Sequence, residues 1–357
     1  MTIGVALLGI THPHTSGRAE VFAELPDVKL LAVYDKDPVV KALSQYTGLP
    51  VRSPSDILSD AAVDIVLVHS QTEEMVDYGV AALEAGKSVL VEKPCGIGPE
   101  DLNRLVEAQE RSSAVLQAGF NFRFSPVVEA MKEIVDGGVL GEITQVRAHG
   151  GCALGEHKTP MLNRPKDIGG AFFVIGCHIV DIVLHLFGAP NRISATVAKF
   201  PRVSDETSRE DSVAACLVYD NKLVSIDYTA QDPLGNVESW DFFFNGIDGV
   251  MYASLLPGRF KLFLREPRGR FAAGWSSWLE GQFPTPWSGQ PTAFSPDIPA
   301  VANKDFFRRE AAQFMDAFRG KRDVPIDAAH ARLVAATIDA CYRSSRQDGV
   351  RLEFQTP

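Results

Sequence analysis

The chain has 357 residues, of which 45% are hydrophobic and 22% are charged, and its formal net charge is −10 at pH 7. This length suggests about two domains, and the composition is that of a soluble globular protein with ample apolar residues for a packed core. Binding to nucleic acid or to an anionic membrane needs basic surfaces, so the acidic balance argues against both classes of partner.

Nothing in the sequence predicts export or membrane insertion. The N-terminus lacks the basic and small-residue features of a secretion signal, and no apolar run reaches the roughly 18 residues that span a bilayer. The five cysteines are an odd number without a Cys-x-x-Cys pair, as in the reduced thiols of an intracellular protein. We therefore expect a cytoplasmic protein.

The first third of the chain alternates apolar runs with helical patterns. The runs expected to be strands occupy residues 3–8, 28–34, 63–69, 88–91 and 114–117. Strands that are apolar throughout and separated by helices predict a parallel, doubly wound α/β sheet. We assign residues 1–120 to this first domain.

The pattern changes after residue 120. Helical patterns at 125–136 and 171–187 precede strand-like runs between 193 and 264, and helices at 305–319 and 328–344 close the chain. We predict an α+β domain over residues 121–357 with a mostly antiparallel open sheet, whose last helices are able to pack back on the first domain. Residues 266–300 are rich in Gly, Pro, Ser and Trp and are expected to be irregular.

The turn after the first strand is a broken dinucleotide fingerprint. The sequence Gly-Ile-Thr-His-Pro-His at residues 9–14 keeps only Gly9 of the three glycines in G-x-G-x-x-G, because Thr11 and His14 replace the other two. Asp35 ends the second strand, where a carboxylate binds the ribose hydroxyls of NAD and repels the 2′-phosphate of NADP, although Lys36 could soften that preference. The two interpretations are a site for NAD, with NADP as the alternative, and a fold of this class that has lost its cofactor.

His12 and His14 also form a His-x-His pair, which is a common arrangement of metal ligands. The sequence indicates no third ligand nearby, so we predict no metal site.

Two residues stand out as candidates for catalysis. Lys93 follows the buried run at 88–91, and a lysine at the carboxyl end of a strand in an open α/β sheet faces the ligand crevice. Its ammonium can stabilise a developing alkoxide, although a surface ion pair is the simpler interpretation. His178 lies in an apolar helix, where it is either a general base or a core histidine.

The sequence resembles the glucose–fructose oxidoreductase, inositol dehydrogenase and rhizopine-catabolism (Gfo/Idh/MocA) family over nearly its whole length. The matching segments are Glu-Lys-Pro at 92–94, Gly-Phe-Asn-Phe-Arg-Phe-Ser-Pro at 119–126, Gly-Val-Leu-Gly-Glu-Ile at 138–143, Gly-Gly-Ala at 169–171, Gly-Cys-His-Ile-Val-Asp at 176–181 and Tyr-Arg-Ser-Ser at 342–345. The resemblance implies an N-terminal Rossmann domain, a C-terminal α/β domain whose open sheet forms oligomer interfaces, and reversible NAD(P)-dependent oxidation of a sugar or cyclitol. It implies catalytic roles for Lys93 and His178.

The chain departs from the family four residues before His178. Family members generally carry Asp there, and this chain has Val174, which can neither accept a proton nor hydrogen-bond a hydroxyl. Asp167 or Glu156 could take over the missing carboxylate.

The remaining expectations concern ligands and partners. The predicted cofactor-binding residues are Gly9, Ile10, Thr11, His12, His14, Asp35, Ser70, Glu92 and Lys93. The predicted substrate contacts are Asn121, His157, Arg164, Asp167 and His178. Asp181 either orients an imidazole or bridges to another helix, and Arg123 either binds substrate or braces the domain junction. Trp275, Trp278 and Trp287 are expected at a subunit interface of a homodimer or homotetramer rather than on a sugar face.

Three functions follow from these residues. The first is a sugar or cyclitol dehydrogenase. The second is a lyase or glycosidase-like relative that oxidises its substrate transiently, and the third is a non-catalytic NAD-binding regulator.

Overall fold

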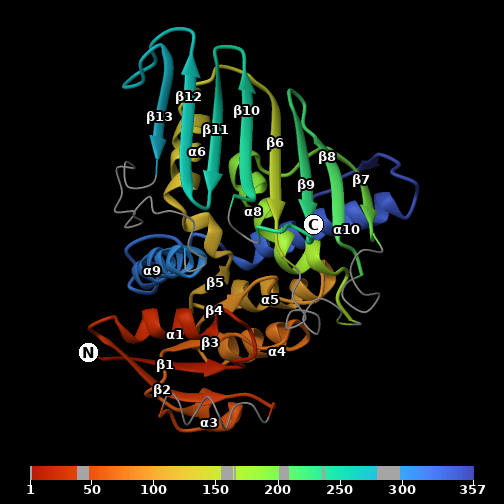
Figure 1. Cartoon of the computed structure of the whole chain (residues 1–357). Helices are drawn as coiled ribbons and strands as arrows, with labels where there is room; N and C mark the ends of the chain where they lie inside the picture. Colours follow the sequence, from red (N-terminus) through yellow and green to blue (C-terminus); the bar gives the residue numbers. More distant parts are fainter. Residues whose placement is uncertain are drawn as a thin grey trace. The chain divides into compact units, whose positions relative to one another are not determined.

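The computed structural model of the chain describes residues 2–37, 48–153, 164, 166–200, 209–234, 238–279 and 298–357. These residues form two compact units, whose elements are labelled in Figure 1. The first unit contains Met1–Phe120 and Phe307–Leu333, and the second contains Asn121–Phe306 and Val334–Pro357. The chain therefore leaves the first unit, returns to it late, and leaves it again.

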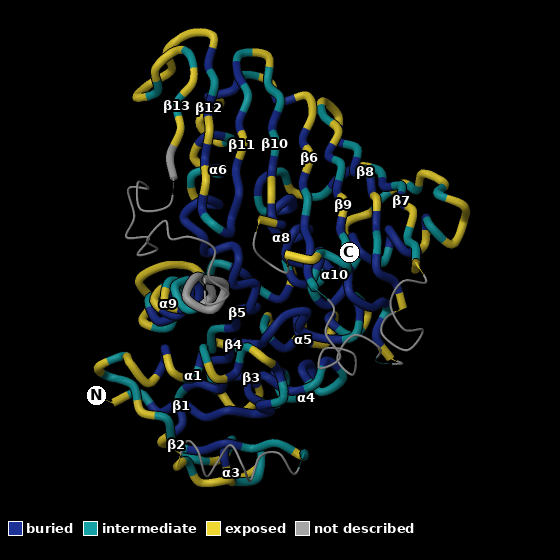
Figure 2. The backbone as a smooth tube through the Cα atoms, viewed as in Figure 1, coloured by how far each residue is buried: buried dark blue, intermediate teal, exposed yellow. Residues whose placement is uncertain are grey.

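The first unit is built on a five-stranded parallel sheet in the order β2-β1-β3-β4-β5, which confirms the predicted sheet. Its strands are β1 (Ile3–Leu8), β2 (Val28–Tyr34), β3 (Ile65–Val68), β4 (Ser88–Glu92) and β5 (Leu116–Gly119). Its helices include α1 (Thr15–Ala23), α3 (Pro54–Ser59), α4 (Thr72–Glu84) and α5 (Pro99–Arg111). Strands β3 and β4 are buried along their whole length, as the dark blue in Figure 2 shows, which explains their unbroken apolar pattern.

The late segment completes the core of this unit. Helix α9 (Ile298–Phe318) contributes Phe314 and Met315 to a cluster that contains Leu7 of β1 and Phe22 of α1. Phe314 meets the ring of Phe22 edge-on, with centroids 6.2 Å apart.

The second unit is built on a nine-stranded sheet in the order β13-β12-β11-β10-β6-β9-β8-β7-β14. Neighbouring strands are antiparallel except for β6 and β9, as predicted for the class of fold. The strands are β6 (Ile143–Gly151), β7 (Arg192–Ala198), β8 (Ser212–Val218), β9 (Leu223–Thr229), β10 (Trp240–Gly246), β11 (Gly249–Leu255), β12 (Gly258–Leu264), β13 (Gly274–Leu279) and β14 (Leu352–Glu353).

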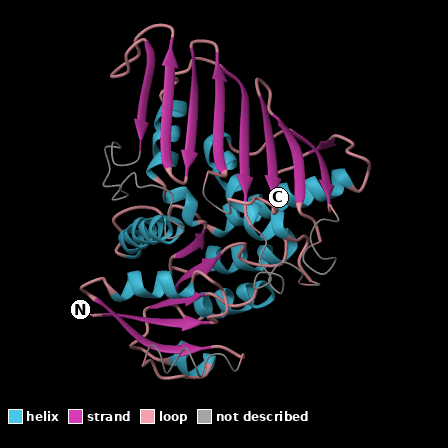
Figure 3. Ribbon diagram, in the orientation of Figure 1, coloured by secondary structure: helices cyan, strands magenta, loops and turns pink. Residues whose placement is uncertain are grey.

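Helices cover one face of this sheet. Helices α6 (Pro126–Asp136) and α8 (Cys177–Phe187) pack on it, as Figure 3 shows, and α10 (Ala328–Ser345) closes the chain. The alternation in β12 reflects the two faces, because Phe260 and Leu262 are buried while Arg259 and Lys261 are exposed. No described helix is both long enough and apolar enough to cross a bilayer.

Strand β13 and the start of helix α8 differ from the sequence-based expectation. Strand β13 lies inside the segment predicted to be irregular, where it pairs antiparallel with β12. Its Gly274, Ser276 and Ser277 have low strand propensity, so the sequence did not predict a strand there. The strand forms because β12 provides hydrogen-bond partners for its backbone. The helix predicted over 171–187 begins instead as a π-helix at Phe172–Gly176, a wider turn that is frequent at functional sites.

Gly9 ends β1 with a backbone conformation that only glycine adopts easily. Its φ is +76°, and a Cβ atom added there would lie 2.3 Å from Cα and Cβ of Ser70. The turn after β1 therefore requires glycine both for its φ and for its contact with the chain that follows β3.

We expect Gly9→Ala to destabilise the first unit by about 3 kcal/mol or more, because the added methyl group overlaps backbone atoms as well as straining φ. Gly86→Ala is the matched control, since Gly86 has a φ of +72° with nothing within 4 Å of the added Cβ atom. It should cost only about 1 kcal/mol. Chemical denaturation of both variants measures the difference, and equal losses would show that the contact with Ser70 is relieved.

Candidate functional site

Backbone hydrogen bonds attach the turn at residues 9–14 to the ends of the neighbouring strands. The amide of Gly9 donates to the carbonyl of Tyr34 at 2.7 Å, and the amide of His12 donates to the carbonyl of His69 at 3.1 Å. Thr15 ends the turn, where its Oγ1 donates to the carbonyl of His12 at 2.6 Å. The turn is therefore held in place before any ligand binds.

Asp35 reinforces this arrangement from the end of β2. Its Oδ2 accepts a hydrogen bond from the amide of Ile10 at 2.6 Å, and its Oδ1 accepts one from the amide of Asp37 at 2.9 Å. The carboxylate retains lone pairs for ribose hydroxyls. The amide of Ile10 is already engaged by Asp35, so its predicted contact with a pyrophosphate stays a prediction.

A buried arginine lies below the turn. Arg18 of α1 is fully buried and donates through Nη1 to Glu92, the last residue of β4. Its Nε donates to Oε2 of Glu310 on α9 at 2.8 Å. Its Nη1 also lies 2.9 Å from Nε2 of His69, and its Nη2 donates to the carbonyl of Gly119 at 3.4 Å. One guanidinium thus joins the helix after the turn to the ends of β4 and β5 and to α9.

The two carboxylates of this cluster have opposite pKa shifts. Burial would raise the pKa of Glu92, but Arg18 outweighs burial and holds it well below its usual range. Burial raises the pKa of Glu310 to about 7, because Arg18 offsets the loss of hydration only in part and Glu92 adds repulsion. Burial also opposes the charge on Arg18, yet Glu310 and Glu92 raise its pKa. Glu92 therefore carries the negative charge at neutral pH, while Glu310 exchanges a proton there.

Three histidines surround Glu92 or Arg18, and all of them are neutral at pH 7. Burial lowers the pKa of His12 well below its usual value, and it lowers the pKa of His14 as well. Burial, reinforced by Arg18, lowers the pKa of His69 to about 3.

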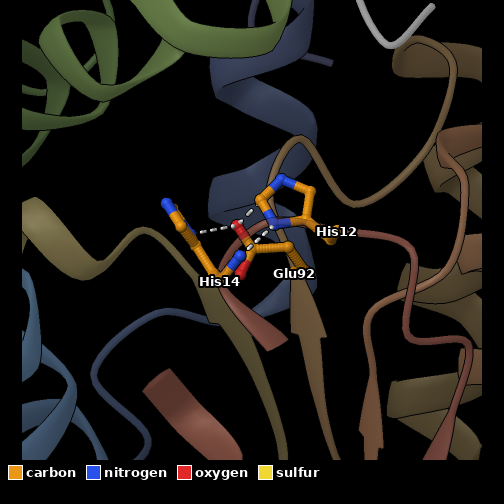
Figure 4. Close-up of side chains that lie close together, drawn as sticks. All are labelled: His12, His14 and Glu92. Carbon is orange, nitrogen blue, oxygen red and sulfur yellow. Dashed lines mark hydrogen bonds and ion pairs between the residues drawn. The ribbon is translucent and has the colours of Figure 1, made fainter. Parts of the chain in front are cut away.

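His12 and His14 point toward the same oxygen of Glu92, as Figure 4 shows. Nδ1 of His14 lies 3.1 Å from Oε1 of Glu92, and Nε2 of His12 lies 3.8 Å from it. Spacing in the sequence did not indicate a third candidate ligand for the His-x-His pair. The structure brings Glu92 to that position from the end of β4.

The other predicted cofactor residues of the first unit lie near this turn. Lys93 follows Glu92 and has only 3% of its surface exposed, and Ser70 is buried against Gly9. Thr11 is partly exposed. The burial of Lys93 contradicts its interpretation as a surface ion pair.

In the second unit, aromatic rings hold His178. It is the second residue of α8 and has 2% of its surface exposed. Its ring stacks on Phe122 with centroids 4.4 Å apart and planes at 18°, and Trp240 lies edge-on with its centroid 6.2 Å away. These contacts fix the plane of the imidazole. Val174 lies in the preceding π-helix with 1% of its surface exposed.

Arg123 and Asp181 pair with each other within the second unit. Arg123 lies in the short 3₁₀ helix η1 (Asn121–Phe124) and forms a buried two-pronged pair with Asp181. Asp181 thus bridges α8 to η1, and Arg123 braces the second unit.

The predicted substrate residues differ in what the structure shows. Asn121 is fully buried, and neither polar atom of its side chain has a hydrogen-bond partner among the described residues. Asp167 is buried, and the carbonyls of Asp167 and Arg164 both accept from Arg209. His157, like Glu156, lies outside the described residues.

Sequence reasoning missed the residues that support the site from behind. Arg18 and Glu310 are 292 positions apart, so no local pattern joins them. Glu210 was also missed; it is buried and accepts hydrogen bonds from the amides of Gly170 and Phe172 and from the hydroxyl of Tyr342.

Sequence comparison matches both units to one family. Residues 3–120 match an oxidoreductase family with an NAD-binding Rossmann fold, and residues 128–249 match the GFO/IDH/MocA C-terminal domain. The first of these models describes an oxidoreductase family with an NAD-binding Rossmann fold, and the second describes a C-terminal domain of the same family. The chain belongs to the Gfo/Idh/MocA family, which confirms the resemblance inferred from its motifs.

Similar curated proteins act on several alcohols. The myo-inositol 2-dehydrogenase of Thermotoga maritima is 26% identical over 189 residues, which are 52% of this chain and 54% of the relative. The D-glucoside 3-dehydrogenase of Escherichia coli is 28% identical over 214 residues, which are 57% of this chain and 59% of the relative. The chain thus spans about half the length of the curated relatives it matches.

Solved structures show the same fold over the whole chain. A levoglucosan dehydrogenase in complex with NADH and levoglucosan has a TM-score of 0.81 at 17% identity and is covered, like this chain, over 100% of its length. An oxidoreductase from Agrobacterium radiobacter in complex with NAD⁺, L-tartaric acid and magnesium has a TM-score of 0.82 at 16% identity, over 99% of this chain and 98% of that one.

The pKa of Glu310 predicts a pH-dependent contribution to the stability of the first unit. Its pKa of about 7 exceeds the ordinary value of 4.5, so the folded state holds a proton that the unfolded state releases in that window. The stabilising contribution is present below pH 4.5 and is lost as the pH rises through 7, with a span of about 3 kcal/mol. Glu310→Gln, which mimics the protonated group, should therefore gain stability over the wild type as the pH rises from 4.5 to 8.

The measurement is the difference in unfolding free energy between variant and wild type at each pH, which removes the opposite contributions of Glu92 and the histidines. Glu133→Gln is the control, because Glu133 is an exposed carboxylate that also pairs with an arginine, Arg270. The difference in unfolding free energy between Glu133→Gln and the wild type should not change with pH. If the difference for Glu310→Gln is also independent of pH, Glu310 is charged throughout the range.

Proposed function

We propose that the chain is an NAD(P)-dependent oxidoreductase that transfers hydride between nicotinamide and a secondary alcohol or ketone of a sugar, glycoside or cyclitol. The observation that carries the proposal is the burial of Lys93 at the carboxyl end of β4, in the same unit as the turn at residues 9–14. Its neighbour Glu92 contacts His14 of that turn. A lysine removed from water beside a dinucleotide turn is suited to chemistry rather than to solubility.

The residues of the first unit fit a dinucleotide despite the altered glycines. Gly9 has no Cβ atom, which leaves room for Ser70 in the chain segment after β3. Asp35 presents a carboxylate at the end of β2. That carboxylate favours NAD over NADP, because a 2′-phosphate would be repelled. When bound, the cofactor supplies the hydride acceptor.

The chain's own residues supply proton transfer and electrostatic stabilisation. Lys93 holds a positive charge for the substrate oxygen as it becomes an alkoxide. His178 accepts the hydroxyl proton, and the loss of this proton and of a hydride from the carbinol carbon leaves a ketone. In the reverse direction His178 returns the proton. The stacking of its ring on Phe122 keeps the nitrogen atoms in one plane for this transfer.

Val174 leaves the site without the carboxylate that the family carries before the histidine. Asp167 is the described candidate to replace it, since it is buried and precedes the π-helix. Asn121, with an unpartnered buried amide, is the best supported substrate contact, because a sugar hydroxyl would satisfy both of its polar atoms. Arg164 and His157 remain weaker candidates.

We expect Lys93→Ala and His178→Ala each to lower kcat by about 100-fold or more, because positioned proton transfer and alkoxide stabilisation each contribute on that scale. The assay follows the reduction of NAD to NADH with a panel of sugars, glycosides and cyclitols. Lys132→Ala and His149→Ala are matched controls at exposed or half-buried ion pairs and should retain activity.

A near-normal kcat in both Lys93→Ala and His178→Ala would show that these two residues are not catalytic. Tight NAD binding without turnover on any substrate would instead favour the non-catalytic regulator. NAD that stays bound through repeated eliminations, without net reduction, would favour the lyase-like alternative.

The protein is proposed to act as a homodimer or homotetramer. The face of the nine-stranded sheet opposite α6 and α8 carries neighbouring aromatic side chains: Phe243 lies 4.5 Å from Tyr252, and Trp275 lies 6.3 Å from Tyr252 and 5.3 Å from Phe263 between ring centroids. Trp275 has 61% of its surface exposed. An aromatic patch of this kind is typical of a surface that a partner covers. The side chain of Trp278, and Trp287 as a whole, lie outside the described residues.

We expect Trp275→Glu to reduce the molar mass in solution to that of a monomer, because a carboxylate in the aromatic patch would have to lose its hydration on association. Light scattering after gel filtration measures the mass. Val350→Glu is the control, since Val350 is an apolar residue with 53% exposure outside the patch. An unchanged mass for Trp275→Glu would place the interface elsewhere.

A further inference from the structure

We propose that His12, His14 and Glu92 form a binding site for a divalent transition-metal ion, zinc or an ion of similar ligand preference. One nitrogen from each histidine and one oxygen of Glu92 lie within 4.8 Å of one another (Figure 4). This site goes beyond the proposed dehydrogenase function and does not depend on it.

The distances are close to those of a metal centre. Zinc binds imidazole nitrogen and carboxylate oxygen at about 2.0–2.2 Å, so ligand atoms in a tetrahedral site lie roughly 3.3–3.5 Å apart. Oε1 of Glu92 lies 3.1 Å from Nδ1 of His14 and 3.8 Å from Nε2 of His12. These two separations lie on either side of the required value, and the three ligand atoms together lie within 4.8 Å of one another, so side-chain rotations would have to draw them closer around an ion.

A buried atom of His12 lacks a hydrogen-bond partner and faces Glu92. Nε2 of His12 has none among the described residues, although only 7% of the residue is exposed. An unsatisfied polar group in the interior costs about 1–3 kcal/mol, and a bound ion would remove that cost. This observation is independent of the clustering and points to a ligand at the same position.

Glu92 is held in an orientation suited to a metal ligand. Its second oxygen accepts from Arg18, which leaves Oε1 toward the two histidines. A hydrogen-bonded outer partner of this kind orients ligating carboxylates in metal sites. The charge of Arg18 opposes a cation, and the ionised fraction of Glu310, which contacts the guanidinium, offsets part of that repulsion.

The donor set selects the class of metal. Two imidazoles and one carboxylate suit zinc, cobalt, nickel or iron, whereas magnesium prefers oxygen ligands throughout. Three protein ligands leave a coordination position open for water or another small ligand.

Metal entry would change the positions of the ring protons in the cluster. The ion would take the place of the proton between His14 and Glu92, and the neutral ring of His14 would carry its proton on Nε2 instead of Nδ1, without net release. Binding through Nε2 of His12 would also place the ring proton on Nδ1, which ends the 3.2 Å contact that Nδ1 accepts from the amide of His14.

The test is a titration of the full-length protein after removal of metals with a chelator. Cobalt(II) should produce ligand-field absorption in the visible range at one equivalent, and zinc should displace it. His12→Ala and His14→Ala should weaken binding by more than about 100-fold, since the loss of an outer partner alone costs about 10- to 100-fold. Magnesium at the same concentration should produce no heat in calorimetry.

His149→Ala is the matched control, because His149 also lies beside a carboxylate, Asp227, but outside the cluster. It should bind cobalt as the wild type does. The heat of zinc binding should not vary with the ionisation enthalpy of the buffer, because ligands that are already neutral imidazoles and a carboxylate release no proton. The melting temperature should rise with zinc for the wild type and the control only.

The cobalt titration of the wild-type protein tests for the metal site even if a variant fails to fold. Absence of cobalt binding, or equal binding after His12→Ala, would overturn the proposed site. NAD is titrated separately on the metal-free protein, so a failure of cofactor binding would count against the dehydrogenase and leave the metal site standing.

Discussion

The first unit depends on one buried guanidinium. Arg18 joins α1, the ends of β4 and β5, and α9 through Glu92, Gly119 and Glu310. A charge buried this completely is tolerated only when its partners remain in place, and removing one partner of such a pair typically costs about 3–5 kcal/mol. The position of Lys93 follows from this constraint, because its neighbour Glu92 is held by the same contact. The position of Lys93, which we propose contacts the substrate, therefore depends on the contact between Arg18 and Glu92.

The replacement of two fingerprint glycines changes the side chains of the turn but leaves its backbone conformation in place. Gly9 is retained where a side chain would collide with Ser70, so the one glycine that sterics require is kept. His14 stands where the fingerprint has its third glycine, and with His12 it presents imidazoles to Glu92. In the second unit, Val174 removes a carboxylate while the ring of His178 stays clamped by Phe122. Substitutions at functional positions have thus been accepted where the backbone allowed them.

The predictable part of this structure is the part set by local periodicity. The parallel strands were recognisable because β3 and β4 are buried on both sides and carry no polar interruption. Strand β13 was not, since its pairing with β12 rather than its own composition makes it a strand. The residues of the candidate site also fall into a predictable group and an unpredictable group. Lys93 and His178 stand in recognisable motifs, whereas the contact of His14 with Glu92 spans 78 positions and that of Arg18 with Glu310 spans 292. Contacts of that length depend on the completed fold, so spacing in the sequence carries no trace of them.

The late return of the chain to the first unit has a consequence for the order of synthesis. The ribosome completes all five parallel strands by residue 119, but Glu310 and Phe314 emerge almost 200 residues later. Until then Arg18 lacks its second carboxylate partner, Glu310, and Phe22 lacks its contact with Phe314, so the nascent sheet carries an open apolar surface. The first unit therefore begins the chain but is complete only at Leu333, and a fragment that ends at residue 120 lacks part of its own core.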